Sequence, residues 1–220
     1  MCKTLIALCL LLPLFTFSQI AFVELASKQV PEPSVRDTAV ENWNRSQPGF
    51  DQLPKEAKEM LYWTNYARRT PEKFWTAVVV PVIDAFHPLN KPEAKSLRSE
   101  LYKAGPLPMF SLNQALLSTS QSHADDIGKK KAPLSHTSTN GADFGARMKK
   151  ANIKYCANEN ISLSSQSILL STILLYLDIG VAGMGHRKAL MDPSLREIGV
   201  GSSLYDKDQY FLVQDFACKQ

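Results

Sequence analysis

Hydrophobic residues recur at helical spacing in two long stretches of the chain. The first stretch starts at Leu53-Pro54, where a proline can open a helix, and continues to Arg69, with Pro71 as its stop signal. The second stretch starts at Ser111, a residue type that caps helices, and closes near Gly128. One face of this second predicted helix is formed by Leu112, Ala115, Leu116, Thr119, His123 and Ile127.

Shorter elements are predicted between and after these helices. Residues 74–83 are apolar, contain Pro81 and predict a second short element. Residues 87–108 are rich in proline and charge, which predicts an irregular connection around a short helix. Another short helix is expected from Asp143 to about Ala151.

The run Ile168–Leu177 is apolar nearly all round. It is too short for a membrane span, which needs about 20 apolar residues. The pattern therefore predicts a buried helix that other elements cover on several sides. Ser167 is expected to begin this helix, and Gly180 is expected to be the left-handed cap at its end.

The C-terminal part of the chain carries a hairpin pattern. Glu197–Tyr205 and Gln209–Ala217 flank the turn Asp206-Lys207-Asp208, and a further strand is expected over Asn158–Leu163. Helices followed by a strand, a helix and a hairpin predict an α+β fold. In that fold, helices pack on the faces of a small, mostly antiparallel sheet.

The N-terminus has the three regions of a secretory signal. Lys3 provides the cation, Leu5–Phe17 is the apolar core, and small polar residues end it, with cleavage expected before Gln19. Residues 1–18 are therefore predicted to be a signal peptide. The alternative is an uncleaved membrane anchor, for which the run is short.

Residues 19–52 are predicted to form a linker or a loosely attached N-terminal arm. The part over 28–50 is rich in proline, serine, asparagine and charge, and it contains the glycosylation sequon Asn44-Arg45-Ser46. The remaining residues, 53–220, have the length of one domain.

Charge and cysteine content narrow the class of protein. The net charge is only +4 and the lysines are scattered, which gives no reason to expect a nucleic-acid partner. Removal of the signal peptide would take Cys2 and Cys9 and leave Cys156 and Cys218. Two lone cysteines in an exported protein usually pair, so we expect a disulfide; two buried free thiols are the alternative.

Two histidines and two acids lie at the ends of predicted elements. His136 follows the long helix, Glu159 enters a strand, Asp178 ends the apolar helix, and His186 follows a glycine-rich loop. These side chains suit zinc or another divalent cation, and they also suit a proton-transfer pair. The alternative is that both histidines only satisfy buried hydrogen bonds.

Other candidate residues are better explained by structure than by chemistry. His123 lies on the apolar face of a helix and is expected in the core, where Asp126 could pair with it. Asn65 and Arg68 share one helix face and are expected to be a structural hydrogen-bond pair. Ser135 has no nucleophile elbow around it, which argues against a serine nucleophile.

Seven motifs in register resemble the CAP superfamily, which includes cysteine-rich secretory, venom-allergen and plant pathogenesis-related proteins. The resemblance covers about residues 53–217 and is closest to the bacterial branch of that superfamily. The motifs are Leu61-x3-Asn65-x2-Arg68, His123-Ala124-x-Asp126, Leu134-Ser-His-Thr137 with Gly141 and Arg147, Glu159-Asn-Ile161, Gly185-His-Arg187, Ile198-Gly-Val-Gly201 and Val213-Gln-Asp-Phe216.

This resemblance implies a three-layer α-β-α sandwich with a central cleft that carries two histidines and two acids. The family pattern transfers to His136, Glu159 and His186, and Asp178 is the best candidate for the second acid, although it is one carbon shorter than the family's glutamate. We expect His136, Glu159 and His186 to converge on one solvent-reachable cleft, with Asp178 close by and the two histidines as metal ligands.

The resemblance leaves two classes of function open. The first is a binding module, secreted or periplasmic, whose cleft takes a divalent metal or a small or lipidic ligand, or whose partner is a protein. The second is a metal-assisted or acid/base hydrolase that uses the same residues. A base and a polarising group can be named for a hydrolase but an oxyanion stabiliser cannot, which favours binding. No integral membrane protein is expected after signal cleavage.

Overall fold

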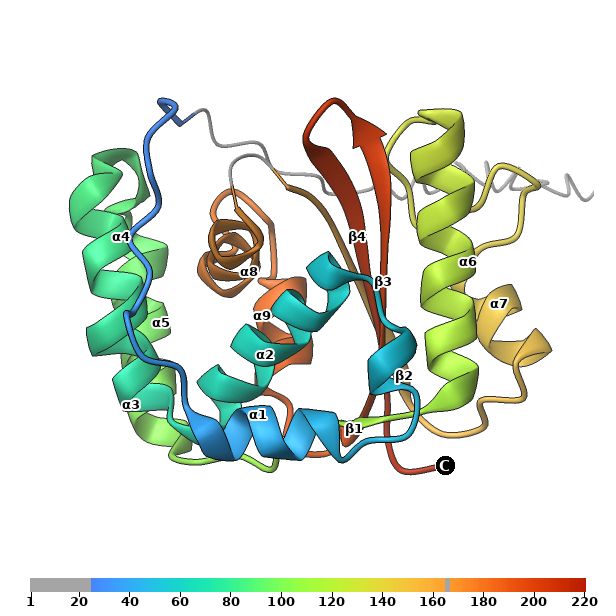
Figure 1. Ribbon diagram of the computed structural model, residues 1–220, viewed down its shortest axis with the longest axis horizontal. Coiled ribbons are helices and arrows are strands. Elements are labelled where there is room, and N and C mark those ends of the chain that lie inside the picture. The colour runs from blue at the N-terminus through green and yellow to red at the C-terminus, as the bar shows by residue number, and fades with distance from the viewer. Residues whose placement is uncertain (1–24, 165–166) are drawn as a thin grey trace, which may run out of the picture.

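A central sheet between helical layers forms the protein (Figure 1). The computed structural model describes residues 25–164 and 167–220, so the predicted signal peptide and its cleavage site lie outside the described residues. The three-layer α-β-α sandwich predicted from the sequence is confirmed. Within the described part of the chain, no helix is long and apolar enough to cross a membrane.

The sheet has four strands in the order β1-β3-β4-β2. The predicted hairpin is formed by β3 (Glu197–Asp206) and β4 (Gln209–Ala217), and β2 (Ala157–Leu163) pairs antiparallel with β4 at the edge. The two-residue strand β1 (Ser111–Leu112) pairs parallel with β3. The sheet is therefore mixed, although its long strands are antiparallel as expected.

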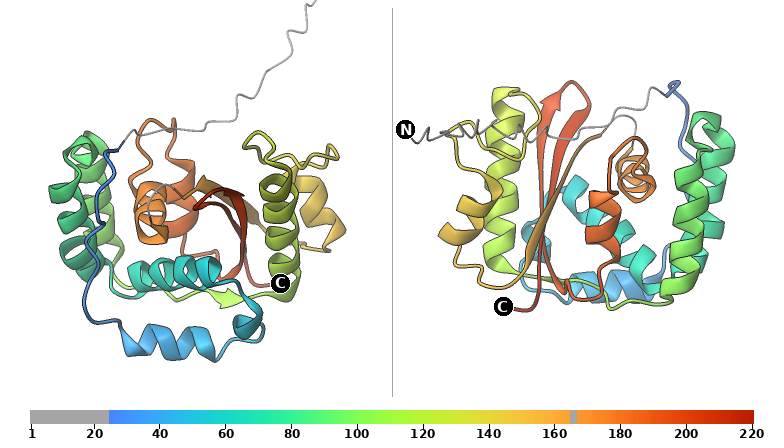
Figure 2. Two further views of the ribbon diagram at one scale, coloured as in Figure 1. Left: turned by 45° about the horizontal axis from the view of Figure 1, so that its top comes forward. Right: turned by 180° about the vertical axis from the view of Figure 1, so that it is seen from behind.

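One face of the sheet is covered by α6 (Gln114–Lys130), with α7 (Phe144–Lys150) beyond it (Figure 2). The N-cap of α6 is Asn113, whose side chain accepts from two backbone amides, and not Ser111, which lies in β1. Gly199 and Gly201 of β3 let α6 approach closely, because an added Cβ at either position would overlap backbone atoms of the helix.

The opposite face is covered by α2 (Lys55–Arg69), α8 (Ile168–Leu177) and α9 (Gly185–Met191). An outer set of helices contacts these: α3 (Pro71–Phe74), η2 (Trp75–Val79), α4 (Val80–Ala85), η3 (His87–Leu89) and α5 (Pro92–Ala104). Helix α8 contacts α2, α5, α9 and β2, so the prediction of a buried helix covered on several sides is confirmed. Helix α5 is longer than the short helix expected there.

The predicted linker contains ordered structure. Helix α1 (Thr38–Arg45) is capped by the Asp37 side chain, and η1 (Phe50–Gln52) follows it. Val40 is fully buried, and the Trp43 indole donates to the Phe110 carbonyl at 2.9 Å. Asn44 of the sequon is buried as well, and its amide oxygen accepts from Asn65. Residues 38–52 are thus part of the packed fold, unlike the loose arm that composition predicted.

A disulfide joins Cys156 to Cys218, as the sequence predicted. The two Cα atoms are 5.4 Å apart, and the Cys218 amide donates to the Cys156 carbonyl at 2.9 Å. The bridge links the start of β2 to the end of β4, at the strand that also carries Glu159.

Candidate functional site

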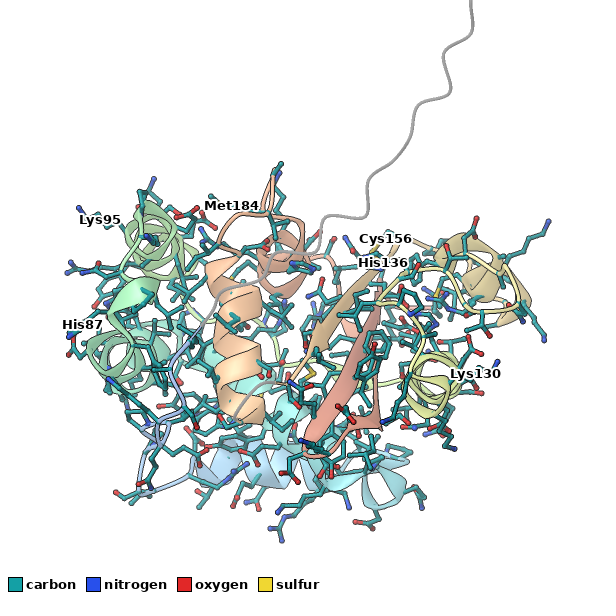
Figure 3. All side chains as sticks on the ribbon, turned by 90° about the horizontal axis from the view of Figure 1, so that it is seen from above. His87, Lys95, Lys130, His136, Cys156 and Met184 are labelled. Atoms are coloured by element: carbon teal, nitrogen blue, oxygen red, sulfur yellow. A yellow bond between two sulfur atoms is a disulfide. The ribbon has the colours of Figure 1, made fainter. Side chains whose placement is uncertain are left out.

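His136 and Glu159 form a hydrogen-bonded pair. The Nδ1 atom of His136 lies 2.8 Å from Oε1 of Glu159. The glutamate side chain is almost fully buried at 1% exposure, whereas the histidine side chain is 40% exposed. Figure 3 places His136 between the sheet and the helices α6 and α7. The buried acid therefore orients a histidine that solvent can reach.

Arg147 of α7 holds both members of this pair. Its guanidinium forms an ion pair with the second oxygen of Glu159 and donates to the His136 carbonyl at 2.7 Å. Burial alone would raise the pKa of Glu159, but the hydrogen bond from His136 and the charge of Arg147 lower that pKa below its usual value. Glu159 is therefore held as a carboxylate.

The loop that carries His136 is fastened to α6 by His123. The Nε2 atom of His123 lies 2.9 Å from the Ser135 carbonyl, and its Nδ1 atom lies 3.0 Å from the Ser138 hydroxyl. Because a carbonyl can only accept, Nε2 carries the proton and Nδ1 accepts from Ser138. Burial lowers the pKa of His123, which keeps the ring neutral. The prediction of a core histidine is confirmed, since its exposure is 1%.

Asp126 fastens the same loop but does not pair with His123. Its carboxylate accepts from the Thr139 amide and hydroxyl and from Lys130. The Ser135 hydroxyl accepts from the Thr137 amide, so this side chain also supports the turn.

His186 and Asp178 form a second pair of the same kind. The Nδ1 atom of His186 lies 2.7 Å from Oδ1 of Asp178, and Oδ2 accepts from the Arg187 amide at 3.1 Å. Asp178 is itself the left-handed residue that ends α8, with φ of 55°, so it takes the role predicted for Gly180. Its side chain is fully buried, and the His186 side chain is 15% exposed.

Two buried arginines of the sequence motifs bind backbone carbonyls. Arg187 donates to the carbonyls of Tyr176 and Leu177 at the end of α8, both at 2.6 Å. Arg68 donates to Pro108, Leu190, Asp192 and Leu195. Asn65 bonds Asn44 and both polar backbone groups of Phe110, so Asn65 and Arg68 are structural residues but do not pair with each other.

The two His–acid pairs flank the edge strand β2. Glu159 faces α7 through Arg147, whereas the next residue, Asn160, points the other way and donates to the His186 carbonyl at 3.3 Å. The views from behind and from above show β2 between the α6–α7 layer and α9 (Figures 2 and 3). The four predicted residues thus meet as two pairs. Among the described residues, no three His, Cys, Asp or Glu side chains gather closely enough to hold a metal ion.

Sequence reasoning missed a third acid, Asp215. It lies opposite Glu159 in the β2–β4 register, is fully buried, and accepts from the Thr119 hydroxyl at 2.6 Å. Burial and the neighbouring charge of Glu159 raise the pKa of Asp215 well above its usual value. The available signal was an acid, next to Gln214, in the largely apolar predicted last strand.

Two cavities of about 330 and 360 Å³ lie away from these pairs, and both are lined by Arg36 and Glu59. The first is bordered by α1 and α2, and the second also reaches Tyr210 of β4. Neither is lined by the four predicted site residues.

The order of the motifs along this fold is that of one family. The model of CAP, the cysteine-rich secretory protein family, matches residues 61–216. The chain belongs to the CAP family. The matched range begins in α2 and ends in β4, so it includes both His–acid pairs. No curated protein matches the sequence.

Solved structures of bacterial proteins are similar to parts of this CAP chain. An extracellular protein containing a SCP domain from Bacillus anthracis is 26% identical, with a TM-score of 0.41 over 51% of this chain and 35% of that one. An outer surface protein from Borrelia burgdorferi is 17% identical, with a TM-score of 0.44 over 57% and 86%. A cysteine-rich secretory protein from Staphylococcus aureus is 14% identical, with a TM-score of 0.37 over 58% and 36%. The chain thus spans about a third of the B. anthracis and S. aureus proteins.

The donor chemistry of the two pairs fits a divalent cation in one specific way. Each imidazole turns Nδ1 to a buried carboxylate, which leaves Nε2 as the ring nitrogen for a ligand. Metal-binding histidines commonly have such an outer carboxylate partner. Glu159 and Asp178 are already engaged by neighbouring donors, so they fit that outer position better than that of direct ligands.

Proposed function

We propose that this CAP protein is a secreted or periplasmic binding module. In this proposal residues 1–18 direct export, and the two His–acid pairs form the ligand site. A divalent cation such as zinc is the ligand, held by Nε2 of His136 and Nε2 of His186. Water or the polar end of a small or lipidic molecule completes the coordination.

One observation carries the proposal: both histidines are oriented by a buried acid through Nδ1, at 2.8 and 2.7 Å. An acid in that position fixes the tautomer and raises the basicity of the free nitrogen. Zinc accepts neutral imidazole as a ligand. Two protein ligands are fewer than the four of a structural zinc site, so the proposal is an exchangeable cation and not a structural one.

Calorimetric titration of the purified protein with zinc at neutral pH tests the proposal. The variants are His136→Ala, His186→Ala and the double variant, and His87→Ala is the matched control because His87 is exposed on η3, on the outer helical layer. We expect zinc binding by the wild type and the control, weaker binding by each single variant, and none by the double variant. Equal zinc binding by the wild type and the double variant would overturn the proposal.

A further inference from the structure

Asp215 and Glu159 place two carboxyl groups in one buried spot. They face each other across β4 and β2, and the two residues are 0% and 6% exposed. Arg147 of α7 is the cation paired with Glu159. One guanidinium cannot neutralise two adjacent carboxylates, and two like charges at short range in a dry site oppose each other's ionisation. This repulsion favours retention of a proton by one of the two acids.

The surroundings decide which acid keeps it. Glu159 receives His136 on one oxygen and Arg147 on the other, and both contacts favour its charged form. Among the residues that the structure describes, Asp215 receives one side-chain donor, the Thr119 hydroxyl, on Oδ2. Its Oδ1 is a buried atom without a donor among the described residues, which is costly for a carboxylate oxygen.

We propose that Asp215 is a neutral carboxylic acid whose Oδ1–H donates to Glu159, and that it is a positioning residue for the Glu159–His136 pair. A proton on Oδ1 gives the orphan oxygen a hydrogen-bonding partner and removes the second negative charge. Glu159 then receives three donors, from Asp215, Arg147 and His136, which fix its carboxylate plane and hence the ring of His136. The consequence for ligand binding rests on the proposed function, but the protonation of Asp215 does not.

The titratable and polar groups around Asp215 come from the elements packed against it other than β3, which places Gly199 opposite Asp215. Glu159 faces it from β2, Arg147 from α7 and Thr119 from α6, with His123 of α6 and His136 beyond Glu159. Burial and the Glu159 charge act against ionisation of Asp215, and Arg147 acts in its favour but is shared with Glu159.

Carboxyl-carbon NMR on the folded protein tests the protonation directly. We expect the side-chain carbon of Asp215 to keep the shift of a protonated acid at neutral pH. Asp208, an exposed residue of the same hairpin, supplies the reference signal for an aspartate side-chain carbon. If the side-chain carbon of Asp215 has the shift of an ionised carboxylate at neutral pH, the proposal is wrong.

A pair of variants tests the same point through stability. Asp215→Asn has the shape of the neutral acid and can donate to Glu159, but it cannot ionise. A pKa raised in the folded state means that wild-type stability is lost as pH rises above about 4, because the unfolded chain releases this proton first. The unfolding temperature of Asp215→Asn should therefore equal that of the wild type below pH 4 and exceed it increasingly toward pH 7. Asp208→Asn, the control, should show no such trend. A lower unfolding temperature for Asp215→Asn at pH 7 would refute the proposal.

The nitrogen chemical shifts of the His136 ring, measured by NMR, test separately whether Asp215 positions the Glu159–His136 pair. Asp215→Asn should leave the Nδ1–H tautomer unchanged, whereas Asp215→Leu, which has no donor, should shift the populations of the two tautomers. An unchanged His136 spectrum in folded Asp215→Leu would show that Asp215 does not position the pair. Zinc is absent from all three measurements, so a failure of zinc binding would leave their outcome intact.

Discussion

Glu159 accepts from His136 with one carboxylate oxygen and from Arg147 with the other, so one buried acid joins the loop after α6 to helix α7. Arg147 also donates to the carbonyl of His136. The position of the exposed histidine ring therefore depends on an ion pair that lies almost wholly inside the protein.

Replacing Glu159 by Gln should destabilise the protein by about 3 kcal/mol at neutral pH, because Arg147 loses its charge partner in a buried place. Since the folded-state pKa of Glu159 is lowered, the stabilisation from its charge is present above the unfolded pKa of about 4.3 and is lost as pH falls. Chemical denaturation at several pH values checks both points. If the proposed function holds, zinc affinity should also fall about 10–100-fold.

The control for this prediction is Glu72→Gln, which removes an acid that is exposed on α3. Its unfolding free energy should stay within about 0.5 kcal/mol of the wild type. A difference between wild type and Glu159→Gln that does not shrink below pH 4 would contradict the assignment of a charged Glu159.

The disulfide should contribute strongly to stability because it closes a long loop. Its cysteines are 62 residues apart, for which the chain-entropy model gives about 4 kcal/mol. The double variant Cys156→Ala/Cys218→Ala should lose stability of that order in chemical denaturation. In protein that lacks residues 1–18, and with them Cys2 and Cys9, thiol alkylation under denaturing, non-reducing conditions should label no cysteine. Labelling of two thiols would contradict the bridge.

Gly199 and Gly201 of β3 should tolerate no larger residue, because both face the backbone of α6. A Cβ at Gly199 would overlap the backbone of Leu116, which cannot move without displacing the helix. Gly199→Ala should therefore cost at least about 1–3 kcal/mol. Gly145→Ala is the control, because its Cβ would lie at an ordinary contact distance of 3.5 Å from the Asp143 side chain and alanine favours the helix α7. Equal unfolding free energies for the two variants would refute the close-packing explanation.

Elements with a local pattern were predictable, and those held by distant contacts were not. The hairpin β3–β4 and the buried helix α8 follow from runs of hydrophobic residues that need no knowledge of their partners. Helix α1 lies in a polar segment and depends on contacts such as the Trp43 bond to Phe110, 67 residues away. Composition alone indicates a linker there, since it contains no information about that contact.

The candidate site also has features that the sequence could predict and features that it could not. His136, Glu159, Asp178 and His186 could be named as candidates because their residue types at the ends of predicted elements are visible in the sequence. The pairing of each histidine with one particular acid depends on how β2 lies between the two helical layers. The meeting of Glu159 with Asp215 depends on the strand register, which a single sequence does not determine.

Asp126 should act as a charged clamp on the loop that carries His136. It accepts from the Thr139 amide at 2.6 Å, from the Thr139 hydroxyl at 2.7 Å and from Lys130 at 2.6 Å. Burial works against its charge, but the hydrogen bonds from Lys130 and Thr139 lower the pKa of Asp126 to about 2. An aspartate whose folded pKa is lowered stabilises the protein above its unfolded pKa of about 3.9, and this stabilisation is lost as pH falls toward 2.

Asp126→Asn should therefore lower the unfolding temperature at pH 7, with a loss of about 1–2 kcal/mol from weakened hydrogen bonds to a charged group. The gap to the wild type should close as the pH is lowered from about 4 to about 2. Amide hydrogen exchange over residues 135–139 should also become faster at pH 7, because the clamp joins this loop to α6. Asp125→Asn is the control, since Asp125 pairs with the exposed Lys129 on the same helix and should leave the loop exchange unchanged. A stability gap for Asp126→Asn that stays constant down to pH 2 would show that its charge plays no part.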